Sequence, residues 1–91
     1  MAKIMAVLKI YPKDVDVDLD KVITDINSRL PAKYSLVRSE KEYVAFGLYL
    51  LRIYVIMPEE TEGGTEELED LIRGVDGVEN TETEVVTRIS D

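Results

Sequence analysis

The sequence predicts an α+β fold with the element order β-α-β-β-α-β, in which an antiparallel four-stranded sheet carries both helices on one face. Two observations predict it. Four segments have the alternating or β-branched composition of strands, and two others, after the first and the third strand, have apolar residues at helical spacing. The 91 residues contain no linker, repeat or low-complexity tract, so we expect one domain over residues 1–91.

The first strand and the first helix follow from their periodicity. Residues 3–11 alternate, and Pro12 ends the run. The residues of one side are Ile4, Ala6, Leu8 and Ile10. The other side is also partly apolar, which indicates a central strand. Helical spacing then predicts a helix over about 19–30, with Asp18 as its N-cap and Pro31 as its stop.

The two middle strands differ in character. Residues 34–43 are β-prone but carry four charges, which is typical of an edge strand. Residues 48–57 are almost wholly apolar and predict the best-buried strand, although Arg52 marks one of its faces as less covered. Leu48, Leu50, Tyr54 and Ile56 share that face with Arg52, and the opposite, buried face carries Tyr49, Leu51, Ile53, Val55 and Met57. Loops, self-association or a partner are the alternatives for covering it.

The last helix and strand complete the order. Thr65 is the expected N-cap of a helix whose first turns are acidic, and Gly74 or Gly77 ends it. Residues 78–89 form the last strand. We expect one of its faces to carry Thr81, Thr83, Val85, Thr87 and Ile89. This order folds most economically as a ferredoxin-like sandwich with one open sheet face.

Composition excludes several classes of protein. Cysteine and histidine are absent, so we expect no disulfide, no usual zinc site and no cofactor or catalytic residue of those types. The longest apolar run, residues 48–57, is too short to span a bilayer, and the start of the chain has no signal-peptide pattern. We therefore expect a cytoplasmic protein without a membrane partner.

Charge is distributed unevenly along the chain. The net charge is −8, and all of the excess acid lies after residue 58, where twelve acidic residues face only two basic ones, whereas residues 1–58 carry a net charge of +2. A basic stripe for nucleic acid is therefore missing from the second half, which argues against an RNA-binding sheet. The acidic half is either a solvated face or a surface that steers the protein towards a basic partner.

The most informative segment is Ala45-Phe46-Gly47, between the two middle strands. Glycine allows a sharp turn, and the flanking strands already supply the core without the phenylalanine. A phenylalanine held on such a turn can point outward as an anchor for a partner. The alternative is that Phe46 caps the edge of the sheet.

Several segments together resemble archaeal translation elongation factor 1-beta. They are residues 44–48 (VAFGL), 62–68 (EGGTEEL), 72–79 (IRGVDGVE), 7–12 (VLKIYP) and 16–19 (DVDL). The resemblance covers essentially the whole chain. It implies a guanine nucleotide exchange factor for the GTPase elongation factor 1-alpha, with a ferredoxin-like fold and no enzymatic activity. It also implies that Ala45, Phe46 and Gly47 bind the partner, because eukaryotic relatives use the phenylalanine of a Phe-Gly motif as an insertion anchor.

One position departs from the family pattern. Eukaryotic members carry a lysine near the C-terminus that is thought to intrude on the Mg²⁺ and phosphate site, and no lysine follows Lys41 here. Arg88 is the candidate partner-binding cation in that region, although a guanidinium does not replace a compact ammonium. The alternative is that Arg88 is an ordinary strand residue facing Glu82 or Glu84.

Two rival classes share the fold. A small-ligand-binding regulatory module could hold an anion at Gly63-Gly64-Thr65, where a helix begins, but acidic residues crowd that segment. An acylphosphatase-type enzyme needs an arginine in the loop after the first strand, and residues 11–14 supply none. Release of fluorescent GDP from the GTPase distinguishes an exchange factor from both.

Overall fold

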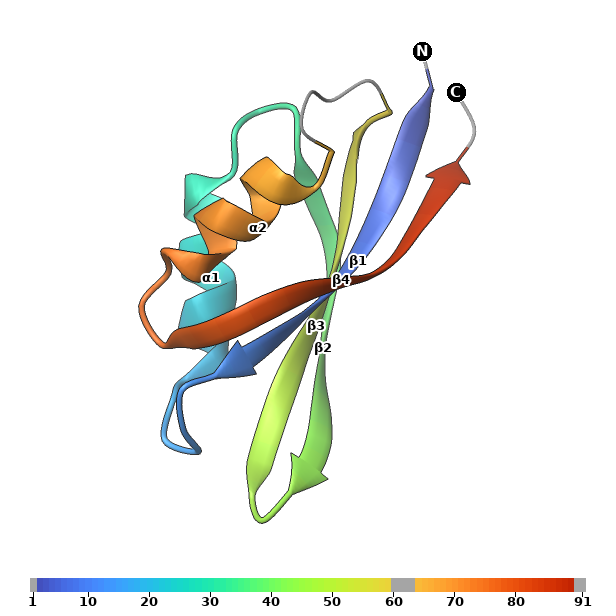
Figure 1. The fold of residues 1–91 in the computed structure, drawn as a ribbon. Helices are drawn as coiled ribbons and strands as arrows, with labels where there is room; N and C mark the ends of the chain where they lie inside the picture. Colours follow the sequence, from blue (N-terminus) through green and yellow to red (C-terminus); the bar gives the residue numbers. More distant parts are fainter. Residues whose placement is uncertain (1, 60–63, 90–91) are drawn as a thin grey trace.

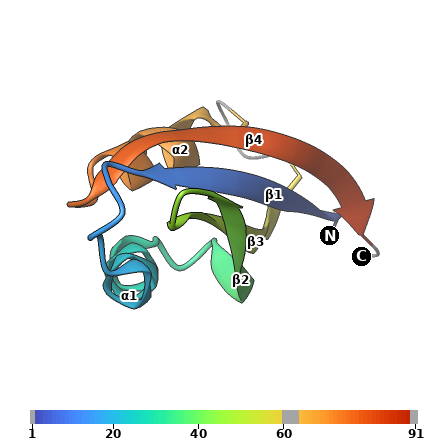
Figure 2. The same ribbon diagram turned by 90° about the horizontal axis from the view of Figure 1, so that it is seen from below.

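The computed structural model describes residues 2–59 and 64–89 and has the predicted element order (Figure 1). The elements are β1 Lys3–Pro12, α1 Leu19–Arg29, β2 Ser35–Ala45, β3 Leu48–Pro58, α2 Glu66–Arg73 and β4 Val78–Ile89. The strands form one antiparallel sheet in the order β2-β3-β1-β4, and both helices lie on the same side of it (Figures 1 and 2). The predicted ferredoxin-like α+β fold is confirmed, with β1 central and β2 at an edge.

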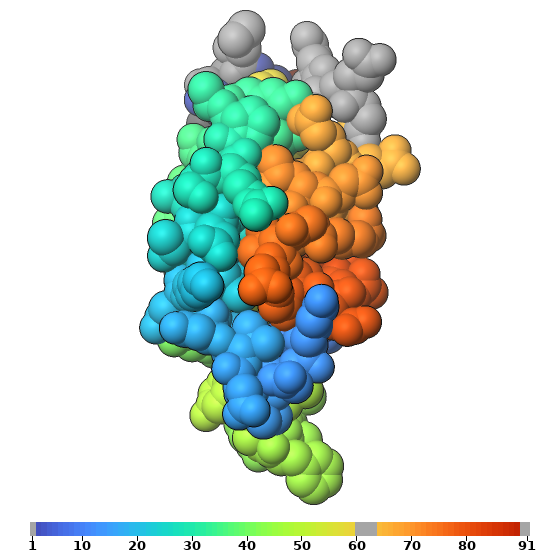
Figure 3. All heavy atoms as spheres, turned by 90° about the vertical axis from the view of Figure 1, so that its left-hand side faces the viewer, coloured from blue at the N-terminus to red at the C-terminus, as the bar shows by residue number. Residues whose placement is uncertain are grey.

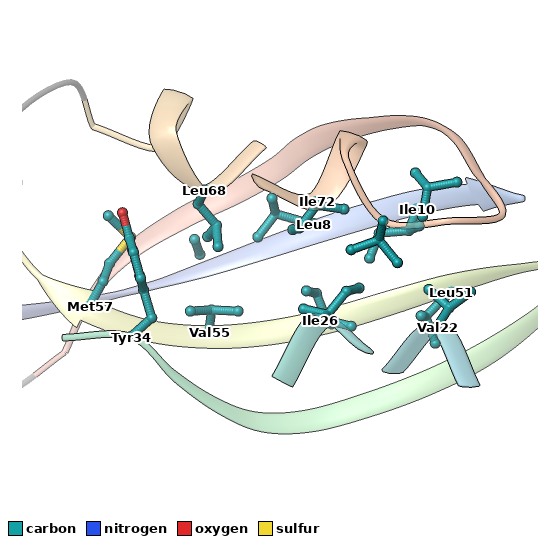
Figure 4. Packing of buried hydrophobic residues seen from close by; sticks show 14 residues of the cluster. Leu8, Ile10, Val22, Ile26, Tyr34, Leu51, Val55, Met57, Leu68 and Ile72 are labelled. Carbon is teal, nitrogen blue, oxygen red and sulfur yellow. The ribbon is translucent and has the colours of Figure 1, made fainter. Parts of the chain in front are cut away.

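The core lies between the sheet and the two helices (Figure 4). Alternate residues of β1 and β3 supply its floor, and each helix lays one apolar stripe on it. Its fully buried side chains include Leu8, Ile10, Ile26, Leu51, Ile53, Met57, Leu68 and Ile72. Burying one such side chain stabilises the fold by about 1.5–3 kcal/mol. The faces assigned to the first strand and to residues 48–57 are confirmed, although Tyr49, on the helix side with Leu51, has an exposed fraction of 46%.

The helices begin in different ways. Asp18 caps α1 as predicted, because its Oδ1 accepts hydrogen bonds from the backbone N–H groups of Asp20 and Lys21 at 3.1 and 3.3 Å. Thr65 occupies the N-cap position of α2, but its side chain makes no capping hydrogen bond, so that part of the prediction is wrong. The Thr65 hydroxyl instead accepts a hydrogen bond from Thr83 of β4 at 3.2 Å.

A β-bulge divides β4 into two halves. Thr83 pairs with Leu8 and Val85 pairs with Val7. Glu84 therefore has no partner of its own in β1 and is the extra residue of the bulge. An extra residue turns the side chains that follow it to the other face of the sheet. Thr83 therefore shares the helix side with Leu8, whereas Val85 lies on the open side with Val7. The prediction that one face carries all alternate residues from Thr81 to Ile89 is wrong beyond the bulge.

The molecule is elongated because its strands are longer than its helices. Its principal extents are 43, 21 and 18 Å. The hairpin of β2 and β3 projects past the helices at one end, and β1 begins and β4 ends at the other (Figures 1 and 3). An 11-residue strand such as β3 spans about 36 Å, whereas the 11 residues of α1 span about 16 Å. The helices therefore cannot cover the far part of the hairpin.

Candidate functional site

The turn of the projecting hairpin has an unusual backbone. Ala45 pairs with Leu48, which leaves Phe46 and Gly47 as a two-residue loop with φ of 53° and 79°. Two positive φ values in succession are typical of type I′ hairpin turns, which favour asparagine or glycine. Gly47 adopts its value without cost, but a phenylalanine at positive φ costs about 1–2 kcal/mol. Among the described residues, Phe46 is the only non-glycine residue with positive φ.

The side chain of Phe46 gains nothing from the fold in return for this strain. Its exposed fraction is 97%, so it contributes to no core and covers no strand edge. The prediction that the core does not need this aromatic is confirmed, and the alternative that it caps the sheet edge is wrong. Strained residues of this kind are found most often at functional sites. Phe46 is therefore the leading candidate for a contact residue.

Other exposed apolar side chains surround Phe46. The rings of Tyr43 and Tyr49 face each other across the two strands in an edge-to-face arrangement, with centroids 5.3 Å apart, and Val44 is half exposed. We call residues 43–49 the hairpin tip. Sequence reasoning missed Tyr43, Val44 and Tyr49 as parts of this surface. A usable signal existed, since aromatic residues at equal distances on both sides of a turn predict a cross-strand pair.

An ion-pair group stiffens the base of the hairpin on the open face of the sheet, which is the face away from the helices. Arg52 of β3 donates hydrogen bonds to Glu42 of β2 and, at 2.8 Å, to Glu84 of β4. Its side chain is only 18% exposed. The hydrogen bond from Arg52 holds the pKa of Glu84 below its usual value. One guanidinium therefore ties three of the four strands together.

The rest of the open face combines a hydrogen-bonded tyrosine with a buried leucine. The Tyr54 hydroxyl donates a hydrogen bond to Glu40 at 2.9 Å, which raises the pKa of Tyr54 and lowers the pKa of Glu40. Leu50 is buried, with 5% of its surface exposed. The prediction that Arg52 marks a less covered face is confirmed, because Leu48, Arg52, Tyr54 and Ile56 are all partly exposed, whereas Leu51 to Met57 on the other face are buried at every alternate residue. Partner binding and self-association on this face stay predictions.

Arg88 lies far from the hairpin tip. It pairs with Ile4 near the start of β1, at the end of the molecule opposite Phe46 (Figure 1). Its guanidinium is 3.2 Å from a carboxylate oxygen of Glu59, and its side chain is 69% exposed. The alternative that it faces Glu82 or Glu84 is wrong, because Arg88 pairs with Ile4 of β1 and its ion pair is with Glu59, which follows β3. The structure does not bring the predicted contact residues together at one point.

The rival sites gain no support from the geometry. Gly63 lies outside the described residues, and Thr65 stands at a helix start whose first turn is acidic, which repels anions. Within the described ranges, no group of three or more acidic side chains is placed to hold a metal ion. In the same part of the chain, no helix is both long and apolar enough to cross a bilayer.

Comparison with known proteins assigns nearly the whole chain to one family. The family described as EF-1 guanine nucleotide exchange domain matches residues 5–89. Elongation factor 1-beta of Ignicoccus hospitalis is 49% identical over 90 residues, which cover 99% of this chain and 96% of that protein. The proteins of the same name from Hyperthermus butylicus and Saccharolobus solfataricus are each 45% identical, over 100% and 98% of this chain and 99% and 98% of their own.

The fold and the family match define a guanine nucleotide exchange domain, a class of protein that acts on a GTPase by binding. It is not an enzyme, as predicted. More particularly, the chain belongs to the elongation factor 1-beta family. Its function is guanine nucleotide exchange for elongation factor 1-alpha in translation elongation. The family match therefore confirms the resemblance drawn from the sequence.

Proposed function

We propose that the hairpin tip is the surface by which this chain holds elongation factor 1-alpha during exchange, with Phe46 as the inserted anchor and Ala45 and Gly47 as its support. One observation carries the proposal: Phe46 is held at positive φ with 97% of its surface exposed. The free protein therefore bears a strain that no intramolecular contact offsets. An apolar pocket on the GTPase would supply the missing contact.

The energetics suit an anchor of this kind. Burying a phenylalanine side chain stabilises a complex by about 1.5–3 kcal/mol, and anchors in well-packed pockets cost 2 kcal/mol or more when truncated. Tyr43, Val44 and Tyr49 would form the surrounding ring that excludes water from the contact. Because the turn fixes the backbone of Phe46 before binding, little conformational entropy remains to be lost in the complex.

Exchange follows from binding without any covalent step. A GTPase holds its nucleotide through a phosphate-binding loop and Mg²⁺, so distortion of those elements weakens nucleotide binding. Coupling between two ligands is reciprocal: if this chain prefers the nucleotide-free GTPase by some factor, it lowers nucleotide affinity by the same factor. Each tenfold preference corresponds to about 1.4 kcal/mol of coupling free energy. Phe46 supplies part of that free energy when its pocket is best formed in the nucleotide-free state.

We assign Arg88 a minor, electrostatic part in the same complex. It lies at the other end of a molecule 43 Å long, so it contacts the GTPase only where the partner extends along most of that axis. The proposal treats residues 1–91 as a single exchange domain, supported by the family match over residues 5–89 and by the one core. Translation elongation places this activity in the cytoplasm, and no direct contact with nucleic acid is proposed.

Release of fluorescent GDP from elongation factor 1-alpha tests the proposal. Phe46→Ala should lower the rate of stimulated release about 30-fold, which corresponds to about 2 kcal/mol. The Tm of this variant should not fall, because the side chain that is removed is exposed. Val37→Ala removes an exposed apolar side chain from the same strand, well away from the hairpin tip, and should exchange normally. Equal rates for wild type and Phe46→Ala would remove the hairpin tip from the mechanism.

A further inference from the structure

An open hollow lies between the start of α1 and the hairpin tip. It has a volume of about 490 Å³ and is lined by Val17, Asp18, Leu19, Lys41 and Tyr49. Figure 3 shows the blue loop between β1 and α1 next to the yellow-green hairpin at this end of the molecule. The hollow is therefore bordered by the start of α1 on one side and by the hairpin on the other. A partner that covers the hairpin tip would also lie over this hollow.

The groups around the hollow favour a cation with an apolar stem. Val17, Leu19 and the half-exposed ring of Tyr49 provide apolar and aromatic surface. Both capping hydrogen bonds of Asp18 go to its Oδ1, and no hydrogen bond or ion pair within the described residues uses its Oδ2. This second oxygen can accept from a donor that enters the hollow.

The basic residue in the hollow does not oppose such a cation. Lys41 Nζ lies 2.9 Å from Oδ1 of Asp20, so its charge is already compensated. The carboxylate of Asp18, which accepts two capping hydrogen bonds but has no ion pair among the described residues, is thus the negative charge that faces the hollow. The loop before α1 also carries Asp14 and Asp16, and Oδ1 of Asp14 accepts a hydrogen bond from the backbone N–H of Asp16 at 2.8 Å.

We propose that the hollow receives an arginine or lysine side chain of elongation factor 1-alpha, with its alkyl stem against Val17 and Leu19, its cationic group beside Asp18, and the ring of Tyr49 along its side. Long basic side chains bury their stems on apolar surface in this way, and a cation beside a tyrosine ring is attracted by its π-system. This inference rests on the proposed function, because the hollow adjoins the hairpin tip. A second copy of this chain fits less well, since two chains of net charge −8 repel each other.

Charge removal without loss of the helix cap tests the proposal. Asp18→Asn and Asp18→Ser both keep a good N-cap residue while removing the carboxylate. Each should weaken binding of nucleotide-free elongation factor 1-alpha about three- to tenfold at low salt, and the difference should shrink at high salt because exposed charges are screened. Asp25→Asn makes the same charge change on α1 away from the hollow and should bind like the wild type.

A photo-crosslinking residue in place of Tyr49 identifies the occupant. Benzoylphenylalanine at this position keeps an aromatic ring in the hollow, and its cross-link to the GTPase is mapped by mass spectrometry. We expect the linked segment to contain an exposed arginine or lysine, and replacing that residue by alanine should abolish the further effect of Asp18→Asn. A linked segment without a basic residue, or additive effects of the two changes, would overturn the proposal.

A parallel arm with Phe46→Ala separates the two levels of inference. If Phe46→Ala weakens binding while both Asp18 variants behave like Asp25→Asn at every salt concentration, the hollow is not a contact and the proposed function stands. If Phe46→Ala also binds like the wild type, the hairpin tip is not the interface, and the assignment of the hollow falls with it. Weakening by Phe46→Ala and by both Asp18 variants, with Asp25→Asn unchanged, supports both levels.

Discussion

Replacing Phe46 by asparagine should stabilise the protein and impair its function at the same time. Asparagine tolerates positive φ, and Asn-Gly is the preferred pair for a type I′ turn, so Phe46→Asn relieves a strain of about 1–2 kcal/mol. No packing is lost, because the side chain is 97% exposed. We expect the free energy of unfolding to rise by about 1 kcal/mol, which raises Tm by roughly 4–8 °C in a domain of this size.

The same change should lower stimulated GDP release about 30-fold, because the anchor is lost. Thermal melts by circular dichroism and release of fluorescent GDP are measured on the same samples. Phe46→Tyr is the matched control, since it keeps an aromatic ring at the same strained position and should change neither quantity much. A lower Tm for Phe46→Asn would show that the turn is not strained, and exchange at the wild-type rate would show that Phe46 is not the anchor.

Two further predictions concern charged groups. Arg88→Gln should lower the exchange rate less than about threefold, because the ion pair of Arg88 with Glu59 is exposed and lies at the far end of the molecule from Phe46. A near-complete loss of exchange that varies with Mg²⁺ concentration would instead give Arg88 the electrostatic role of the missing lysine. In the folded protein the hydrogen bond from Arg52 lowers the pKa of Glu84. The contribution of this pair to stability is therefore present above the pKa of Glu84 in the unfolded chain, and it is lost as pH falls through the lower pKa of Glu84 in the folded protein. Urea melts between pH 6 and about 3 should show this loss, and Arg52→Met should make it smaller; an identical pH dependence in Arg52→Met would contradict the assignment.

The sequence predicted the fold well because each element carries its own local signal. Alternation defined β1, a nearly unbroken apolar run defined β3, and Asp18 and Pro31 marked the ends of α1. The bulge at Glu84 could not be predicted in this way. An extra residue is visible only in the pairing of β4 with β1, which depends on strands more than 70 positions apart in the chain, whereas a period of two is all that the local sequence shows.

The sequence pointed to Phe46 at the centre of the candidate site and missed the residues around it, because the lengths of the helices and strands were not compared. Alternation placed Tyr49 on the buried face of β3, yet it is half exposed. Helices of 11 and 8 residues cover about 16 and 12 Å of a strand that spans about 36 Å. Any residue near the turn is therefore uncovered on both faces. Comparing expected lengths, and not only patterns, would have included Tyr43 and Tyr49 in the surface.

A hairpin that extends past its core must be stiffened by its own side chains, and this requirement explains the charged and aromatic contacts along both of its faces. An anchor on a soft arm would spend binding free energy on ordering the arm, so less would remain to weaken nucleotide binding. Arg52 joins β2, β3 and β4 at the base of the arm, Lys41 ties β2 to α1 through Asp20, and the tyrosine pair joins the strands near the turn. These contacts are charged or aromatic and lie on exposed surface, where a purely apolar face would promote aggregation. In the proposed complex, the free energy of inserting Phe46 would then act on the GTPase through a rigid arm that is fixed to the core at its base.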